Sequence, residues 1–195
     1  MYHSKISGLG FYVPENTVTN DDLSKIIDTN DDWIQERTGI QERRHIINGQ
    51  DTTTSMGVKA AKIAIERAGI SNEEIDFIVF ATLSPDYYFP GPGVLVQRDL
   101  GLKTVGALDI RNQCSGFVYA LSVADNFIKT GAAKCVLVIG AETMSRITDY
   151  SDRSNAILWG DGGGAIILEA SDQPGILSTH IHADGSYEKL LHVPS

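Results

Sequence analysis

Cysteine is scarce in this chain: among 195 residues only Cys114 and Cys135 occur. One pair cannot form the disulfide framework of a small secreted domain, and no Cys-x-x-Cys spacing is present to hold a metal ion. No apolar run approaches the roughly 20 residues that cross a bilayer. We therefore expect a cytoplasmic protein in a reducing compartment, with no metal site and no membrane association.

Positive charge is also in deficit. Lysine and arginine number 16 against 25 aspartate and glutamate residues, which gives a formal net charge of −9 at pH 7. Such a surface repels nucleic acids and anionic lipids, so neither is expected as a partner. An anionic ligand must instead be bound by a local cluster of basic side chains.

Proline is rare and glycine abundant, six residues against 19, which favours short, tight turns between regular elements. The pattern predicts strands at 5–11, 75–83, 105–110, 135–140, 165–170 and 176–181, the last two as antiparallel neighbours. It predicts helices at 20–27, with Asn20 as N-cap, at 31–38, at 54–68, which ends before Gly69, and at 114–130. A further helix is predicted to follow the turn 84–93 and to end at residue 100. Because the central strands are continuously apolar, we expect an α/β fold whose mostly parallel sheet carries helices on both faces.

Cys114 lies between the strand that ends near Ile110 and the helix that follows. Unpaired backbone N–H groups and the helix dipole favour a thiolate there, and a thiolate is a nucleophile suited to acyl transfer. The competing interpretation is a small core hydrophobe, because cysteine is among the most buried residue types. Position alone leaves both open, whereas Cys135 opens an apolar strand and is predicted to be core.

Three motifs follow predicted strands at the edge where ligands collect in open α/β sheets: Phe89-Pro90-Gly91, Cys114 and Glu142-Thr143. With further motifs, in order and spacing, they resemble the β-ketoacyl-acyl carrier protein synthase III family of thiolase-like condensing enzymes over essentially the whole chain. The motifs are DDWIQERTGI at 31–40 with Arg43, Phe89-Pro90, CSGF at 114–117 with YAL at 119–121, SDR at 151–153, WGDGGGA at 159–165 and HADGS at 182–186.

The resemblance implies a thiolase-like fold, of which this chain would form the N-terminal half with a five-stranded sheet. It implies a decarboxylative Claisen condensation that initiates fatty acid synthesis. Cys114 would take an acyl group from acyl-coenzyme A, and the carbanion formed from malonyl-acyl carrier protein would attack the acyl-cysteine. Backbone N–H groups at the helix start would stabilise the developing oxyanion. No cofactor is expected, since the coenzyme A thioester is a substrate.

The resemblance also assigns the coenzyme A site. Trp33 would stack on the adenine, Arg37 and Arg153 would hold phosphates, and Thr29 would line the same opening. The alternatives are a half-buried core aromatic for Trp33 and solvated surface side chains for the two arginines.

Phe89 matches a phenylalanine that reaches across the family's homodimer to close the partner's acyl pocket, and Trp159 is placed with that pocket. The alternative for Phe89 is a loop aromatic packed against its own chain. The glycines at 160–164 do not form a phosphate-binding loop, because the lysine and the Ser/Thr that should follow are missing.

The family's decarboxylating histidine and asparagine come from a second, similar half. None of His3, His45, His180, His182 and His192 has a matching context. Residues 1–172 are therefore interpreted as the half that carries the nucleophile, and 173–195 as a connection or the start of the other half. The polar run at 111–113, where many members carry small apolar residues, leaves the preferred acyl chain open.

Two other functions remain open: a related cysteine-dependent acyl or ketide synthase of secondary metabolism, and a non-catalytic half that supports a partner chain. A hydroxymethylglutaryl-coenzyme A synthase is disfavoured, because that branch carries a glutamate where Leu83 follows Thr82.

We predict that residues 1–195 alone will not release carbon dioxide from malonyl-acyl carrier protein, because no histidine matches the decarboxylating position. Release of labelled carbon dioxide measures this, with an intact synthase of the family as the positive control. Release above the protein-free rate would contradict the prediction.

Overall fold

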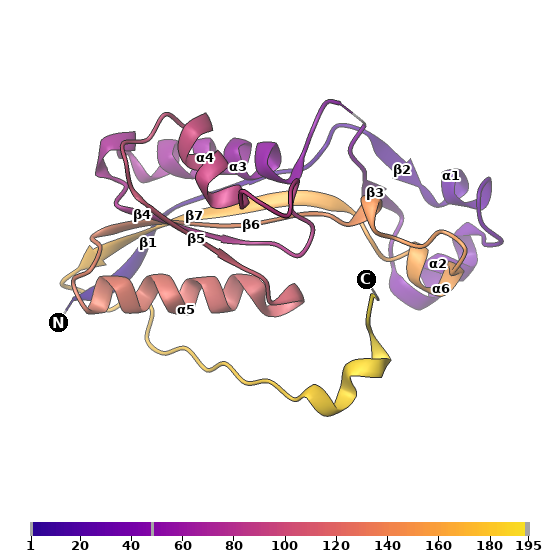
Figure 1. Ribbon diagram of the computed structural model, residues 1–195. Coiled ribbons are helices and arrows are strands. Elements are labelled where there is room, and N and C mark those ends of the chain that lie inside the picture. Colours follow the sequence, from indigo (N-terminus) through magenta and orange to yellow (C-terminus); the bar gives the residue numbers. More distant parts are fainter. Residues whose placement is uncertain (1, 48, 194–195) are drawn as a thin grey trace.

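Five strands form one sheet through the middle of the molecule (Figure 1). The computed structural model describes residues 2–47 and 49–193. The strand order is β1-β7-β6-β4-β5, with β1 at His3–Tyr12, β4 at Phe77–Ala81, β5 at Gly106–Ile110, β6 at Cys135–Thr143 and β7 at Asp161–Ser171. β4 pairs in parallel with β5 and β6, while β7 runs antiparallel to both β6 and β1. Four strands thus share one direction, and the predicted mostly parallel sheet is confirmed.

Helices cover both faces of this sheet, as predicted (Figure 1). α3 (Thr53–Ala68) and α4 (Pro92–Asp99) lie on one face, and α5 (Gly116–Lys129) lies on the other. Alternate strand residues divide between the two cores: Phe80 and Ile139 pack with α3, whereas Val79 and Val138 pack with α5. The central strands read as unbroken apolar runs because each of their faces is buried.

Short 3-10 turns lie at Asn72–Glu74, Gln113–Ser115, Met144–Arg146 and Gly185–Leu190. No helix within the two described ranges is both long and apolar enough to cross a bilayer.

Two glycines of β1 allow α3 to lie directly on the strand. A Cβ atom at Gly8 would overlap the carbonyl oxygen of Ala64, and one at Gly10 would overlap that of Ala60. The helix presents small alanines to the same surface, so backbone packs on backbone with no side chain between.

A second, smaller unit lies beyond the carboxyl ends of the central strands (Figure 1); we call it the small lobe. It contains β2 (Thr17–Thr19), β3 (Glu42–Arg44), α1 (Asn20–Ser24), α2 (Asp31–Thr38) and α6 (Arg153–Ala156). Its own core includes Leu23, Ile34 and Ile157. The buried Arg43 guanidinium ties the lobe together by donating to the Val18 and Ile157 carbonyls and to the Asn20 side chain.

Two predictions about elements away from Cys114 are wrong. The N-cap of α1 is Thr19, whose hydroxyl accepts from the Asp22 N–H, and the helix ends at Ser24. Asn20 is buried instead and donates to Asp31 and to the carbonyl of Ile40, because these acceptors require a donor inside the lobe.

The predicted strand 176–181 is the second error. The segment is extended without forming a strand: the Ile176 N–H donates to the Ser4 carbonyl, and the chain then crosses α5. There the Thr179 and Ser122 hydroxyls lie 3.0 Å apart, and Tyr119 donates to the His182 carbonyl. A pattern of alternating apolar residues does not by itself show which segment a strand would pair with.

We predict that Gly10→Ala lowers the free energy of unfolding by about 2 kcal/mol or more, because the new methyl forces α3 off β1. Gly164→Ala is the matched control, since its nearest non-neighbouring atom lies 4.0 Å away. Urea unfolding of both variants gives the comparison. Equal losses would show that tight packing at Gly10 is not the cause.

Candidate functional site

Cys114 sits on a sharp turn between β5 and α5. It belongs to the 3-10 turn Gln113–Ser115, so the α-helix begins at Gly116 and not at the cysteine as predicted. The preceding Gln113 has φ +46°, a left-handed conformation that is uncommon for a side-chain-bearing residue and frequent at functional turns. Cys114 is exposed, which excludes its interpretation as a core hydrophobe.

The start of α5 is well supported beneath this turn. Gly116 packs toward Ala81 at the end of β4, and Phe117 packs toward Gly140 of β6. Ser115 makes no side-chain capping hydrogen bond to the first-turn amides of α5, although the Gly116 N–H donates to the Gln113 carbonyl. Amides of this kind suit an oxyanion that develops beside the sulfur.

The other cysteine is different in every respect. Cys135 is buried at the start of β6, and desolvation raises the pKa of its thiol to about 12. It is the structural cysteine that its apolar strand predicted.

The four residues assigned to coenzyme A gather in the small lobe. The guanidinium carbons of Arg37 and Arg153 lie 4.3 Å and 4.5 Å from the centroid of the Trp33 ring. Arg153 also donates to the Asp28 carbonyl at 3.0 Å, next to Thr29. Within the described residues, the buried Thr29 hydroxyl has no hydrogen-bond partner.

Both alternatives hold in part at this cluster. Trp33 is half-buried against the small-lobe core, and both arginines are exposed. Two arginines scattered on a surface would not be expected to meet at one indole. Here the two guanidinium groups stack on the same ring and concentrate positive charge around an aromatic face.

Phe89 and Trp159 lie in different surroundings. Phe89 is 86% exposed, so the alternative in which it packs against its own chain is wrong. Trp159 is half-buried near the small lobe, where its indole N–H donates to Asn155 and its carbonyl contacts the His45 ring at 3.1 Å.

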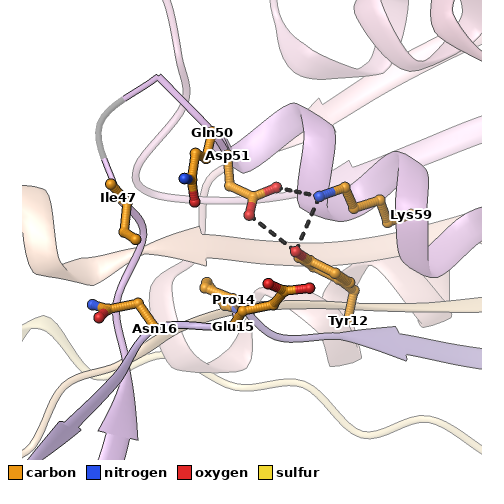
Figure 2. A pocket seen from close by; sticks show the side chains of 8 residues that line it. All are labelled: Tyr12, Pro14, Glu15, Asn16, Ile47, Gln50, Asp51 and Lys59. Carbon is orange, nitrogen blue, oxygen red and sulfur yellow. Dashed lines mark hydrogen bonds and ion pairs between the residues drawn. The ribbon is translucent and has the colours of Figure 1, made fainter.

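A polar pocket of about 260 Å³, which the sequence did not indicate, opens where β1 meets α3 (Figure 2). Inside it, Asp51 accepts from Lys59 at 2.6 Å, from Tyr12 at 3.0 Å and from Ser55 at 3.2 Å. Lys59 also donates to the Tyr12 hydroxyl and lies 4.1 Å above its ring. These groups satisfy one another, so we interpret the cluster as a tie between β1 and α3.

Carboxylates at the strand ends are the functional candidates that sequence reasoning missed. Glu142 had been noted only as following a strand, and Asp109 and Asp161 had no assigned role. Asp161 accepts from the Ile46 and Ser145 N–H groups at 2.7 and 2.8 Å. The sequence signal for these residues was an acidic residue beside an apolar strand. Such a position indicates that the carboxylate has a hydrogen-bond donor, but it does not identify that donor.

Comparisons with known proteins agree with this geometry. A family model described as 3-Oxoacyl-[acyl-carrier-protein (ACP)] synthase III matches residues 108–185. The chain is 52% identical over 194 residues to a beta-ketoacyl-[acyl-carrier-protein] synthase III of Thioalkalivibrio sulfidiphilus, covering 100% of this chain and 60% of the relative. The chain thus spans about 60% of the length of the curated relatives it matches.

Solved structures show the same similarity. The 3-oxoacyl-(acyl carrier protein) synthase III of Pseudomonas aeruginosa PAO1 superposes with a TM-score of 0.92 at 35% identity, covering 99% of this chain and 61% of that one. The priming beta-ketosynthase of the R1128 polyketide pathway has a TM-score of 0.85 at 37% identity, covering 89% and 52%. The resemblance read from the motifs and the thiolase-like α/β fold class are confirmed.

We predict that Asp51→Asn lowers the free energy of unfolding at pH 7 by about 1–2 kcal/mol. Burial opposes ionisation of Asp51, but hydrogen bonds from Lys59, Tyr12 and Ser55 outweigh it and hold its pKa below the usual range. A carboxyl with a lowered folded-state pKa stabilises above its unfolded pKa, near 4, and loses that contribution as the pH falls through the folded value.

The difference between wild type and Asp51→Asn should therefore be present at pH 7 and shrink below about pH 4. Urea unfolding over this range measures it. Asp99→Asn, at the exposed ion pair with Arg98, is the control and should change stability little. A difference that persists undiminished in acid would contradict the prediction.

Proposed function

We propose that this chain, a relative of the β-ketoacyl-acyl carrier protein synthases III, carries the nucleophile of a decarboxylative condensation between acyl-coenzyme A and malonyl-acyl carrier protein. The product would begin a fatty acid. The observation that supports this most directly is an exposed Cys114 on a tight turn at the sheet's carboxyl edge, within a sequence 52% identical to a synthase of that name.

The first half-reaction follows from the geometry around the sulfur. The Cys114 thiolate attacks the thioester carbonyl of acyl-coenzyme A, the carbonyl electrons move onto oxygen, and backbone N–H groups beside the sulfur stabilise that oxyanion. Collapse expels the coenzyme A thiolate and leaves the acyl group on Cys114. Covalent storage splits one difficult condensation into two easier steps.

The second half-reaction breaks the bond between the malonyl carboxylate and its α-carbon. Carbon dioxide leaves, and the electron pair forms a carbanion that attacks the acyl-cysteine carbonyl. The Cys114 thiolate is then the leaving group. Within the described residues we assign no decarboxylating group, so this step would need residues that the family's second half supplies.

Coenzyme A would lie over the small lobe. Adenine would take a face of the Trp33 ring, displacing a guanidinium that now covers it, and Arg37 and Arg153 would bind phosphate oxygens. Thr29, whose hydroxyl has no hydrogen-bond partner within the described residues, would line the same opening. No further cofactor is required by this chemistry.

We also propose a homodimer in the cytoplasm, joined at the open edge of the sheet. Among the residues that the structure describes, β5 pairs only with β4, and Leu108 on it is 38% exposed. Tyr88 and Phe89 are exposed beside that edge. An unpaired strand next to apolar side chains is a surface that another copy of the chain can cover.

A second candidate is a ketide synthase of secondary metabolism with the same cysteine. The likeness to the R1128 priming beta-ketosynthase favours it. Acyl adducts on Cys114, measured by mass after exposure to coenzyme A thioesters of different length and branching, distinguish the two, because the candidates differ in the primer and not in the nucleophile.

We predict that iodoacetamide at pH 7 alkylates Cys114 at least roughly tenfold faster than Cys135, since burial keeps Cys135 protonated and covered. Peptide mass spectrometry measures both rates in the folded chain. Cys114→Ser is the control that must lose the fast adduct. Equal slow rates at both cysteines would favour a non-catalytic partner half and overturn the proposal.

A further inference from the structure

Residues 84–93, which we call the arm, connect β4 to α4 and carry three outward-facing aromatics. Tyr87, Tyr88 and Phe89 are 60%, 103% and 86% exposed. Side chains this exposed have little packing to fix their direction. Whatever sets the direction of the arm must therefore act at its two ends.

The first end is held by one carboxylate. Glu142, at the end of β6, accepts from the Thr82 hydroxyl at 3.0 Å, the Leu83 N–H at 2.9 Å and the Ser84 N–H at 3.1 Å, and also from the Ser84 hydroxyl. The Ser84 hydroxyl in turn accepts from the Thr143 N–H at 2.8 Å. Three consecutive residues at the root of the arm are thus bound to one side chain of the neighbouring strand.

The next residues are fixed against α3. The two carboxylate oxygens of Asp86 accept from the Thr53 and Thr54 N–H groups at 2.9 and 3.0 Å, at the start of the helix. The Ser84 carbonyl accepts from the Thr53 hydroxyl at 2.6 Å. The chain leaves this anchor at Asp86, directly before the exposed aromatics.

The second end is held by Asp109 on β5. Its carboxylate accepts from the Gly93 N–H at 2.7 Å, in the first turn of α4. A Cβ atom at Gly91 would overlap this carboxylate, so the arm closes over it with bare backbone. Asp109 also lies on the strand that leads to Cys114.

Glu142 and Asp109 come from the two strands that flank β4, from whose end the arm departs. We propose that they are positioning residues, which hold both ends of the arm and so fix how Phe89 projects. That Phe89 serves an acyl pocket rests on the proposed function; the clamp itself does not. Because both ends are bound to strands of the sheet, the clamp fixes the direction of the arm before any partner binds.

Chymotrypsin tests the clamp, because it cleaves after exposed aromatics and needs a locally opened chain. Its sites in the arm follow Tyr87 and Tyr88, since Pro90 protects the bond after Phe89. We expect Glu142→Gln and Asp109→Asn to raise the cleavage rate there roughly tenfold relative to Tyr187, a 65% exposed internal reference.

Asp76→Asn is the matched control. Its carboxylate also accepts two backbone N–H groups, those of Lys134 and Cys135, but at the opposite end of β6. It should lower stability without raising cleavage in the arm. If it raises arm cleavage as much as the two clamp variants do, the clamp is overturned and general loosening explains the result.

Two further variants keep the test decisive if an amide substitution prevents folding. Gly91→Ala should displace Asp109 and raise cleavage in the same way, while Phe89→Ala removes an exposed apolar side chain that makes no part of the clamp and should leave the Tyr87 site slow. Iodoacetamide labelling of the same samples separates the two proposals. An inert Cys114 with accelerated arm cleavage refutes the function alone, and a reactive Cys114 with unchanged cleavage refutes the clamp alone.

Discussion

Burial of the central strands on both faces is the constraint on which the rest of this molecule depends. β4 and β6 pack α3 on one side and α5 on the other, so they can carry no polar side chain until they leave the core. Their polar residues therefore begin at one edge, where Thr82, Glu142 and Thr143 follow the apolar runs. The parallel arrangement brings those strand ends together, and the turn that carries Cys114 starts at the same edge.

Carboxylates organise these loops. Glu142, Asp86, Asp109 and Asp161 each accept backbone N–H groups from a segment distant in sequence. A carboxylate offers several lone pairs, so one side chain can satisfy a whole turn whose amides have no helix or strand partner. The net negative charge of the chain thus includes acids that build its architecture by accepting backbone N–H groups.

In the proposed function, the sheet and the small lobe carry different parts of the site. The sheet presents Cys114 on a turn supported by Gly116 and Phe117, while the lobe gathers Arg37 and Arg153 around the Trp33 indole. The buried Arg43 holds the lobe together through carbonyl oxygens and Asn20. The proposed acyl transfer would use both parts, because the reacting carbonyl and the nucleotide end of coenzyme A lie at opposite ends of that substrate.

The sequence by itself determined the apolar strands, the helix α2 with its end at Gly39, the core position of Cys135 and the place of Cys114 between a strand and a helix, because each depends on neighbours in the chain. The 3-10 turn that separates Cys114 from α5 came only from the structure. Motif order added the residues around Trp33. Only the tertiary structure decided that 176–181 crosses α5, that Asn20 is buried while Thr19 caps, and that Glu142, Asp109 and Asp51 have the partners they do. The local sequence pattern indicates that a strand needs a neighbouring strand and that a buried carboxylate needs a hydrogen-bond donor. Which group supplies it is decided by folding, since several partners are distant in the chain, as Leu83 is from Glu142 and Tyr12 from Asp51.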